Sequence, residues 1–315
     1  MRTLLIELCT VFILYIMIGR KKDLTKIKTR QLLTYTAFVA PAVIIFTLII
    51  LIPFLRAILY SFQDWNGISS DIRWAGWANY QKIFSDTGFM KSLIFTSKYV
   101  IVTTILLNLF GLALALVLNL ALKTKNLLRT AFFLPYVIGS VIIGFIWQFI
   151  ITQWFPEVGA ATGWALFQKN WLSLPDFAFW ALVLVTVWHS VGYFMIIYLA
   201  ALQGVPKDIL EAADIDGAGR LKQLWFVVLP LIRPAMTINL FLAISNGFKG
   251  FDLNFALTRG GPFGTTESLA LHIYLDAFTK NLFTYASAKS VLFFLVLAII
   301  TIIQVAAMKR REVEA

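Results

Sequence analysis

The sequence predicts an all-α polytopic membrane protein, and three observations support this. The chain has 315 residues, of which 60% are hydrophobic and only 14% are charged, whereas about a quarter of the residues of a soluble domain are charged. Its apolar residues are too many for a soluble core of this size to bury. They form long runs, and positive charges gather in the short segments between them. We expect six spanning helices and one additional N-terminal helix, which makes seven spans.

The N-terminal run, residues 3–19, is interrupted only by Glu7 and is about the shortest length that crosses a bilayer. A secretory signal peptide is disfavoured, because the basic residues 20–22 follow the apolar part and no small-residue cleavage site is evident. We predict a spanning helix with its N-terminus outside. An interfacial helix is the alternative.

A basic linker separates this helix from the rest of the chain. Residues 20–30 carry six positive charges, which places them in the cytoplasm. We therefore divide the chain into residues 1–30, the N-terminal helix with its cytoplasmic linker, and residues 31–315, the transmembrane domain.

Six longer apolar runs follow, and each is long enough to cross a hydrocarbon core of about 30 Å. They cover residues 32–60, 93–122, 130–151, 177–203, 235–257 and 286–308. We expect Pro135 to kink the start of the third run. Outer loops are predicted between the runs, at residues 61–92, 152–176 and 258–285.

Charge bias sets the orientation. The segments predicted to be cytoplasmic hold sixteen lysines and arginines, and the outer segments hold seven although they are longer. The C-terminus and the polar stretch at residues 204–232 are therefore expected in the cytoplasm. The net charge of +11 reflects this topology, so we predict no nucleic-acid partner.

The polar stretch at residues 204–232 is too charged to lie in hydrocarbon. Pro206 is suited to start a helix, and Gly217 and Gly219 are suited to end it. Apolar residues then recur at three- and four-residue steps as far as Pro230. A short helix that projects from the bilayer suits a groove on a partner protein.

This stretch resembles the cytoplasmic EAA loop of ABC importer membrane subunits. That loop has Glu-Ala-Ala, three residues, Gly, nine residues, a β-branched residue, one residue and then Leu-Pro. The spacing fits here throughout, with Val227 where isoleucine is usual. The residues that carry the loop's role are Glu211, Ala212, Ala213, Asp216, Gly217, Leu229 and Pro230. A polar helical hairpin without a partner is the alternative.

From about Leu32 onward the chain is similar to the carbohydrate-uptake class of these permeases, which contains the maltose-transporter membrane subunits. The ordered set of short stretches that carries this includes residues 61–65, 132–135, 197–203, 251–253 and 257–262. The first 30 residues fall outside the resemblance, so it does not support the additional helix.

The resemblance implies a division of labour in a prokaryotic cytoplasmic membrane. Two ATPase subunits would dock on the EAA loop and bind ATP and Mg, a second permease would complete the path, and an extracytoplasmic solute-binding protein would deliver the cargo. This chain would bind no cofactor. Consistent with that, the sequence contains no G-x-x-x-x-G-K-[ST] phosphate loop.

The sequence also disfavours metal and enzyme sites. Cys9 is the only cysteine, and His189 and His272 are the only histidines. A zinc site or a histidine-based triad is therefore not expected. We predict neither catalytic nor metal-binding residues.

The run at residues 235–257 contains the polar side chains that suit a substrate path. At 100° per residue, Asn239, Asn246 and Lys249 share one helix face, and Asp252 lies close to it. Each ion at mid-bilayer costs about 2.5–3.5 kcal/mol on insertion scales, so this face should line a cavity. Lys249 could attract an anionic sugar. Alternatively, Lys249 and Asp252 pair with each other.

Aromatic residues of the run at residues 177–203 are further candidates. Trp188, His189 and Tyr193 could stack on sugar rings. The resemblance favours Tyr193, and ordinary packing is the alternative. Two lysines near span ends, Lys98 and Lys289, are expected to extend to the membrane surface.

We therefore expect a permease for a sugar or oligosaccharide, with an anionic sugar left open. Glycerol phosphate is an alternative cargo. An ion-coupled secondary transporter is a further alternative, but it would need acids within the membrane, and only Glu7 and Asp252 qualify.

Overall fold

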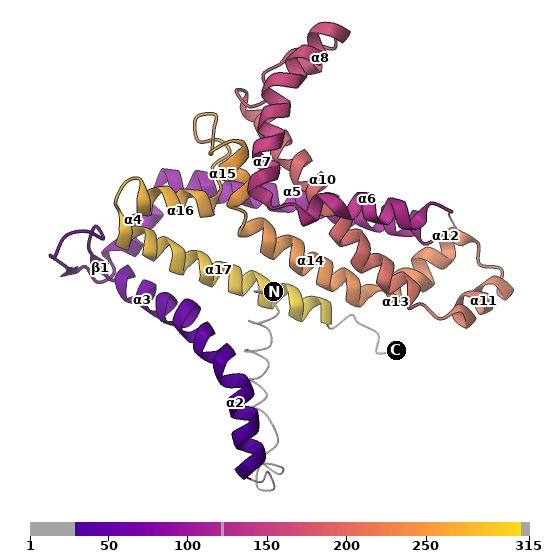
Figure 1. The fold of residues 1–315 in the computed structure, drawn as a ribbon, viewed down its shortest axis with the longest axis horizontal. Helices are drawn as coiled ribbons and strands as arrows, with labels where there is room; N and C mark the ends of the chain where they lie inside the picture. Colours follow the sequence, from indigo (N-terminus) through magenta and orange to yellow (C-terminus); the bar gives the residue numbers. More distant parts are fainter. Residues whose placement is uncertain (1–28, 121–122, 310–315) are drawn as a thin grey trace. The chain divides into compact units, whose positions relative to one another are not determined.

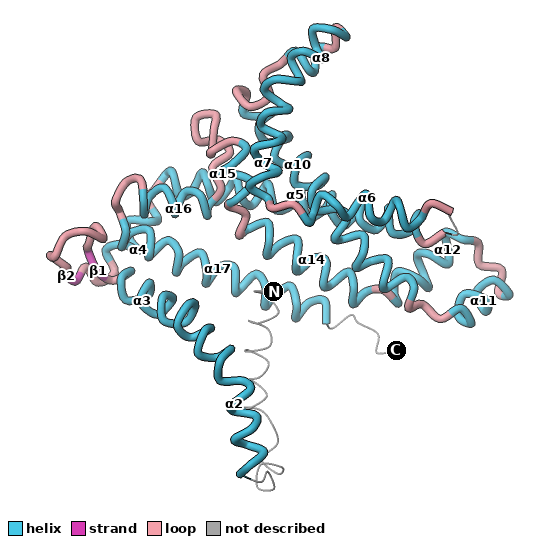
Figure 2. The backbone as a smooth tube through the Cα atoms, in the orientation of Figure 1, coloured by secondary structure: helices cyan, strands magenta, loops and turns pink. Residues whose placement is uncertain are grey.

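The computed structural model describes residues 29–120 and 123–309. The described residues are helical apart from loops and one short β ladder (Figures 1 and 2). The chain divides into two compact units, Met1–Tyr60 and Ser61–Ala315. The predicted N-terminal helix at residues 3–19 lies outside the described residues, so the seventh span stays a prediction.

The described part of the first unit is one long apolar helix with a π-helical turn in it. Its segments are α2 (Thr29–Phe46), η2 (Thr47–Leu51) and α3 (Ile52–Ser61). Residues 38–61 have the length and apolarity of a membrane span, and none of the most apolar part is buried within the chain. This confirms the first predicted run.

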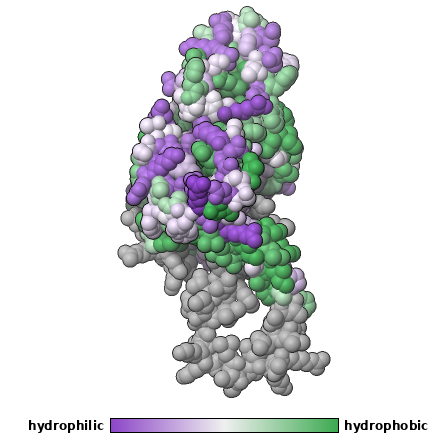
Figure 3. Space-filling view, turned by 90° about the vertical axis from the view of Figure 1, so that its left-hand side faces the viewer, coloured by the Kyte–Doolittle hydropathy of each residue, from purple (hydrophilic) through white to green (hydrophobic). Residues whose placement is uncertain are grey.

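The second unit begins with a small polar cap. It contains β1 (Gln63–Asp64), antiparallel to β2 (Arg73–Trp74), and α4 (Ala78–Phe84). Asn79 ties them together by donating hydrogen bonds to the carbonyls of Ser61 (3.0 Å) and Gln63 (2.8 Å). Figure 3 views the end that carries β1, β2 and α4, where hydrophilic residues gather and hydrophobic residues flank them.

Two long helices, α5 (Thr87–Leu118) and α10 (Pro175–Gln203), form the centre of this unit. α5 starts six residues before the predicted run because Asp86 caps it, accepting a hydrogen bond from Phe89 N at 3.0 Å. Leu107 of α5 packs with Val191 and Phe194 of α10. The core of the unit therefore lies along the α5–α10 contact.

The prediction of a span at residues 130–151 followed by an outer loop is wrong. The chain forms α6 (Lys125–Val137), then α7 (Ser140–Phe149), η3 (Ile150–Trp154) and α8 (Phe155–Thr162), followed by α9 (Ala165–Gln168). Ile138 and Gly139 are extended and separate α6 from α7. Pro156 lies in the first turn of α8, where its missing N–H costs little. The spanning helix therefore covers residues 140–162.

The run at residues 235–257 is not one helix either. After the polar stretch the chain forms α14 (Arg233–Phe248), a break at residues 249–251, and α15 (Asp252–Leu257). The break includes Gly250. The predicted outer loop at residues 258–285 contains a further helix, α16 (Leu269–Phe278), and the last helix is α17 (Phe283–Lys309).

The described residues contain five helices that are long and apolar enough to cross a membrane. A sixth arises if residues 220–231 and 233–248, which meet at 70°, count as one bent span. The six-span core therefore agrees with the prediction in number, with different bounds for the third and fifth spans.

The two lysines near span ends differ. Lys98 is exposed, and its extension to the membrane surface stays a prediction. Lys289 is completely buried and makes ion pairs with Asp86 and Asp276. The prediction that Lys289 extends to the membrane surface is wrong, because acids from two other segments meet it inside the unit.

Candidate functional site

The polar stretch folds as the helix and turn that its sequence predicts. It consists of α11 (Lys207–Ile215), α12 (Arg220–Gln223), η4 (Leu224–Val228) and α13 (Leu229–Leu231). Gly217 ends α11 with a φ of +72°. Ala218 N donates to Ala213 O (2.9 Å) and Gly217 N donates to Asp214 O (3.0 Å). This is a Schellman motif, and glycine avoids the strain of its left-handed residue.

A glutamine that the sequence analysis missed closes the hairpin. Gln223 Nε2 donates hydrogen bonds to Asp214 Oδ1 of α11 and to Ala218 O (2.9 Å). The side chain therefore joins α11, the turn and the end of α12. No periodicity or motif marked Gln223, since glutamine is common on exposed helices.

Large apolar side chains are uncovered on this charged hairpin. They are Ile215 (87% exposed), Leu221 (74%), Trp225 (65%) and Phe226 (79%). Exposed apolar groups beside charges are typical of a surface that another protein covers. Such a surface would suit a groove on a partner.

The residues predicted for the EAA loop lie at both ends of this hairpin. Glu211, Ala212, Asp216 and Gly217 are exposed, and Ala213 is half-buried. The other two, Leu229 and Pro230, are half-buried in α13, and Leu229 packs against the core cluster that contains Leu118 and Tyr198. The motif thus joins an exposed helix to the centre of the transmembrane unit.

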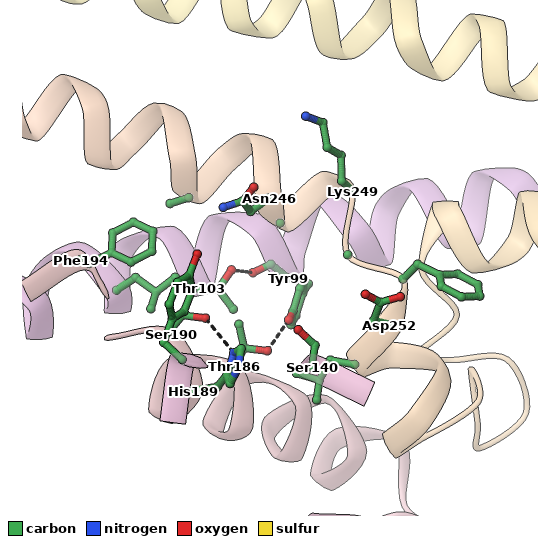
Figure 4. Close-up of a pocket in the computed structure, with 17 residues that line it drawn as sticks. Tyr99, Thr103, Ser140, Thr186, His189, Ser190, Phe194, Asn246, Lys249 and Asp252 are labelled. Atoms are coloured by element: carbon green, nitrogen blue, oxygen red, sulfur yellow. Dashed lines mark hydrogen bonds between the residues drawn. The ribbon is translucent and has the colours of Figure 1, made fainter. Parts of the chain in front are cut away.

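A second candidate site is a cavity of about 350 Å³ in the transmembrane unit (Figure 4). α5, α6, α7 and α10 form part of its wall, and the break between α14 and α15 forms the rest. Its polar lining residues are Tyr99, Thr103, Tyr136, Ser140, Thr186, His189, Ser190, Asn246, Lys249 and Asp252. Six of these ten carry a hydroxyl group, so the wall can donate and accept hydrogen bonds in many directions.

Hydrogen bonds fix the orientation of several lining groups. Tyr99 OH and Thr186 Oγ1 are 2.5 Å apart. His189 Nε2 lies 3.0 Å from the carbonyl of Ile138, so Nε2 carries the proton, and Nδ1 can accept from Ser190 Oγ at 3.3 Å. His189 thereby satisfies a backbone group at the extended break between α6 and α7. Ser190 keeps its hydroxyl oxygen at the cavity.

The two charged residues at the helix break point in different directions. Figure 4 shows the carboxylate of Asp252 on the side of the hydroxyl groups, whereas the side chain of Lys249 extends away from them. Among the ion pairs of the described residues there is none between Lys249 and Asp252. The helix ends between them, so the i, i+3 geometry that would pair them is absent.

Four of the six predicted substrate-path residues line this cavity: His189, Asn246, Lys249 and Asp252. Trp188 is outside the lining and packs edge-to-face on Trp147. Tyr193 stacks on Tyr136, with ring centroids 4.5 Å apart, and so contacts the cavity through it.

The polar face expected on residues 235–257 is divided. Asn239 is buried away from the cavity, and its Nδ2 donates to the carbonyl of Phe194 (3.2 Å). Hydroxyl-bearing residues on α5 and α7, such as Tyr99, Thr103 and Ser140, line the cavity instead. Single hydroxyls in an apolar helix give no pattern that a sequence analysis could detect.

Comparison with known proteins adds a family match. Residues 92–313 match the family described as "Binding-protein-dependent transport system inner membrane component". The chain is 42% identical over 282 residues to the probable starch degradation products transport system permease protein AmyD of Thermoanaerobacterium thermosulfurigenes, which covers 89% of this chain and 95% of that protein. It is 28% identical over 285 residues to the trehalose/maltose transport system permease protein MalF of Thermococcus litoralis, with coverage of 89% and 95%.

Solved structures agree on the fold. A bacterial ABC transporter involved in the import of the acidic polysaccharide alginate aligns with a TM-score of 0.77 and 19% identity, over 89% of this chain and 96% of that one. A second alginate transporter structure, in complex with an alginate pentasaccharide-bound periplasmic protein, aligns with a TM-score of 0.76 at the same identity, over 87% and 93%.

Proposed function

The chain belongs to the family of binding-protein-dependent transport system inner membrane components, and from this premise we propose that it forms half of an ATP-driven import path for a sugar or oligosaccharide. The observation that carries the proposal is the hydroxyl-lined cavity at the break between α14 and α15. Broken helices beside a cavity are typical of transporter binding sites. Relatives named for starch degradation products and for trehalose and maltose support a carbohydrate cargo.

The chain is a transporter subunit rather than an ATPase, so partners supply the energy. Two cytoplasmic ATPase subunits bind ATP and Mg and dock on the hairpin of α11 and α12. The uncovered apolar side chains of that hairpin support this. Leu229 and Pro230 then carry the movement into the transmembrane core, and the cavity opens to each side in turn.

The remaining partners complete the path. A second permease covers the exposed faces of the cavity residues Asn246 and Asp252. An extracytoplasmic binding protein delivers the cargo, which the alginate transporter complex supports by fold analogy. The charge bias supports a C-terminus in the cytoplasm.

The cavity favours a neutral sugar over an anionic one. It contains one lysine and one aspartate, and the lysine extends away from the hydroxyl-lined wall. An anionic sugar or glycerol phosphate would place its charge near Asp252 without a fixed cation beside it.

Reconstitution tests the proposed function. The chain, its partner permease, both ATPases and the binding protein are placed in proteoliposomes, and uptake of labelled maltose, maltotriose and glycerol phosphate is measured. The proposal expects oligosaccharide uptake that requires internal ATP and the binding protein. Uptake that follows a proton or sodium gradient without ATP would overturn it and favour a secondary transporter.

A further inference from the structure

A buried charged cluster lies apart from the cavity and the coupling hairpin. Its centre is Lys289 of α17, which is 0% exposed. Lys289 Nζ lies 2.6 Å from Asp86 Oδ2 at the start of α5 and 2.9 Å from His272 Nε2 of α16, and it also pairs with Asp276 of α16. The consecutive helices α16 and α17 therefore meet the start of α5, which is about 200 residues away in the sequence, at one ammonium group.

The contacts of His272 show that the cluster is fixed in one arrangement. Its Nδ1 lies 2.5 Å from Glu267 Oε1, and a carboxylate can only accept, so Nδ1 carries the proton. Nε2 is then free to accept from Lys289. The imidazole ring is held between Glu267 and Lys289, and the ammonium already supplies the positive charge between Asp86 and Asp276.

A buried ion group of this kind is costly to form, and apolar residues of similar volume are often at least as stabilising. Stability alone therefore explains the cluster poorly. A role in fixing one arrangement of the segments is the better-attested use of buried polar groups.

Hydrogen bonds continue from the cluster to the cavity wall. Glu267 is followed by Ser268 and preceded by Thr266, and both are tied to Asn254 of α15. Asn254 Nδ2 donates to Thr266 O (2.6 Å), and Asn254 Oδ1 accepts from Ser268 N (3.2 Å). Asn254 lies two residues after Asp252, which lines the cavity.

A second connection reaches α5. Leu269 N, at the start of α16, donates to Thr96 Oγ1 at 2.8 Å. Thr96 lies one turn before Tyr99, which also lines the cavity. The start of α16 is thus bonded to both helices that flank this side of the cavity.

We infer that Lys289 is a positioning residue for the cavity. Its ion pairs hold α16 against α5 and α17, and α16, through Asn254 and Thr96, holds Asp252 and Tyr99 in their places. The transport part of this inference rests on the proposed function, whereas the positions of the cavity residues do not depend on the cargo.

The first experiment measures position directly. Asp252→Cys is made in a Cys9→Ser background, so that the engineered thiol is unique. Its rate of modification by a charged, membrane-impermeant thiol reagent is measured in the assembled complex. Lys289→Met should change that rate about tenfold, as befits a mutation within a coupling network. An unchanged rate would overturn the inference whatever the cargo is.

Lys280→Met is the matched control. Lys280 pairs with the same acid, Asp276, at 2.7 Å, but its side chain is 55% exposed, and within the described residues its ammonium makes no other ion pair. The inference expects the thiol engineered at position 252 to react in this variant at the same rate as in the protein with Lys280 and Lys289 intact. An equal change in both variants would mean that loss of any cation beside Asp276 is enough, and would contradict a role specific to Lys289.

A double variant separates positioning from charge compensation. Lys289→Met with Asp276→Asn removes the unpaired buried acid, while Asp86 keeps its bonds from Phe89 N and Tyr285 OH. The inference expects the complex to accumulate normally. Maltotriose transport, measured with Asp252 intact, should be as low as in Lys289→Met alone, and the thiol rate, measured in the Asp252→Cys background, should stay altered. If maltotriose transport and the thiol modification rate both returned to normal, Lys289 would serve only to neutralise Asp276. If the altered rate appears but no variant or wild type transports sugar, the proposed function fails and the positioning role stands.

Discussion

Gly192 of α10 lies directly against the main chain of α6: a Cβ at this position would be 1.9 Å from the carbonyl oxygen of Phe132. Close backbone approach at small residues is how membrane helices pack without a hydrophobic driving force. The contact sets the distance between Tyr136 of α6 and His189 of α10, which both line the cavity.

Gly192→Ala should therefore reduce the amount of folded protein, because the clash is with backbone that cannot rotate away. Overpacking of this kind costs about 1–3 kcal/mol. Thermal unfolding in detergent and membrane abundance measure the effect. Gly139→Ala is the control, since a Cβ there meets nothing within 4 Å. Equal stability of the two variants would contradict the backbone contact.

Gly217→Ala should weaken coupling and leave the protein in the membrane. The residue has a φ of +72°, and an L-residue there costs about 1–2 kcal/mol, so the end of α11 should fray. The measurement is sugar transported per ATP hydrolysed in proteoliposomes. Gly219→Ala, at a φ of −64° and with open space around it, should behave as wild type. The hairpin's role would be wrong if both variants transported normally.

Asp252→Asn should reduce uptake of a neutral oligosaccharide more than Lys249→Ala does. The carboxylate lies beside the hydroxyl-lined wall, and the ammonium extends away from it. Loss of a hydrogen bond to a charged group costs about 1.5–3 kcal/mol, which corresponds to a tenfold loss or more. Uptake per molecule of permease in membranes measures it. The reverse order of effects would indicate that Lys249 holds the cargo and would favour an anionic sugar.

Acid should destabilise the protein through Asp86. Burial raises the pKa of Asp86, but the hydrogen bonds from Lys289, Phe89 N and Tyr285 and the charge of Lys289 outweigh it and hold the pKa below its usual value of 3.8. Because the pKa of Asp86 is lower in the folded than in the unfolded chain, its ionised form stabilises the fold. This contribution to the free energy of unfolding is complete above the unfolded pKa of about 3.9 and is lost progressively as the pH falls below that value. The melting temperature of the wild-type protein, measured from pH 7 to pH 3, should fall at the acid end of the range. The melting temperature of Asp86→Asn should fall less steeply. Parallel declines in both proteins would exclude this contribution.

Hydrophobic runs predicted most of the spans in the described residues because each span must be apolar over its length whatever it packs against. Their ends were less predictable. The predicted outer loop began at residue 152, whereas the helix continues past Pro156 to Thr162. Gly139, which does mark a break, lies inside the apolar run at residues 130–151, where the adjacent Ser140 alone did not indicate a helix end.

The hairpin of α11 and α12 was predictable because the residues that shape it are close together in the sequence. Pro206 and Gly217 act through their own backbone geometry, so the sequence alone indicates a helix start and a turn. The cavity and the cluster depend on which segments meet in space. Asn239 lies within reach of the cavity by helical angle and yet faces α10. Lys289 appeared to be a surface lysine because its partners, Asp86 and Asp276, lie up to 203 residues away in the chain.

The side chain of Gln223 gives the hairpin a mechanical property. If only Gly217 and Gly219 joined α11 to α12, the two helices could rotate relative to each other. A displacement of α11 would then not be passed on to α12. Gln223 bridges that joint by bonding Asp214 and Ala218 at once. These bonds hold α11, the turn and α12 together as one unit, and under the proposed docking role a displacement of Ile215 would be passed through α13 to the transmembrane core.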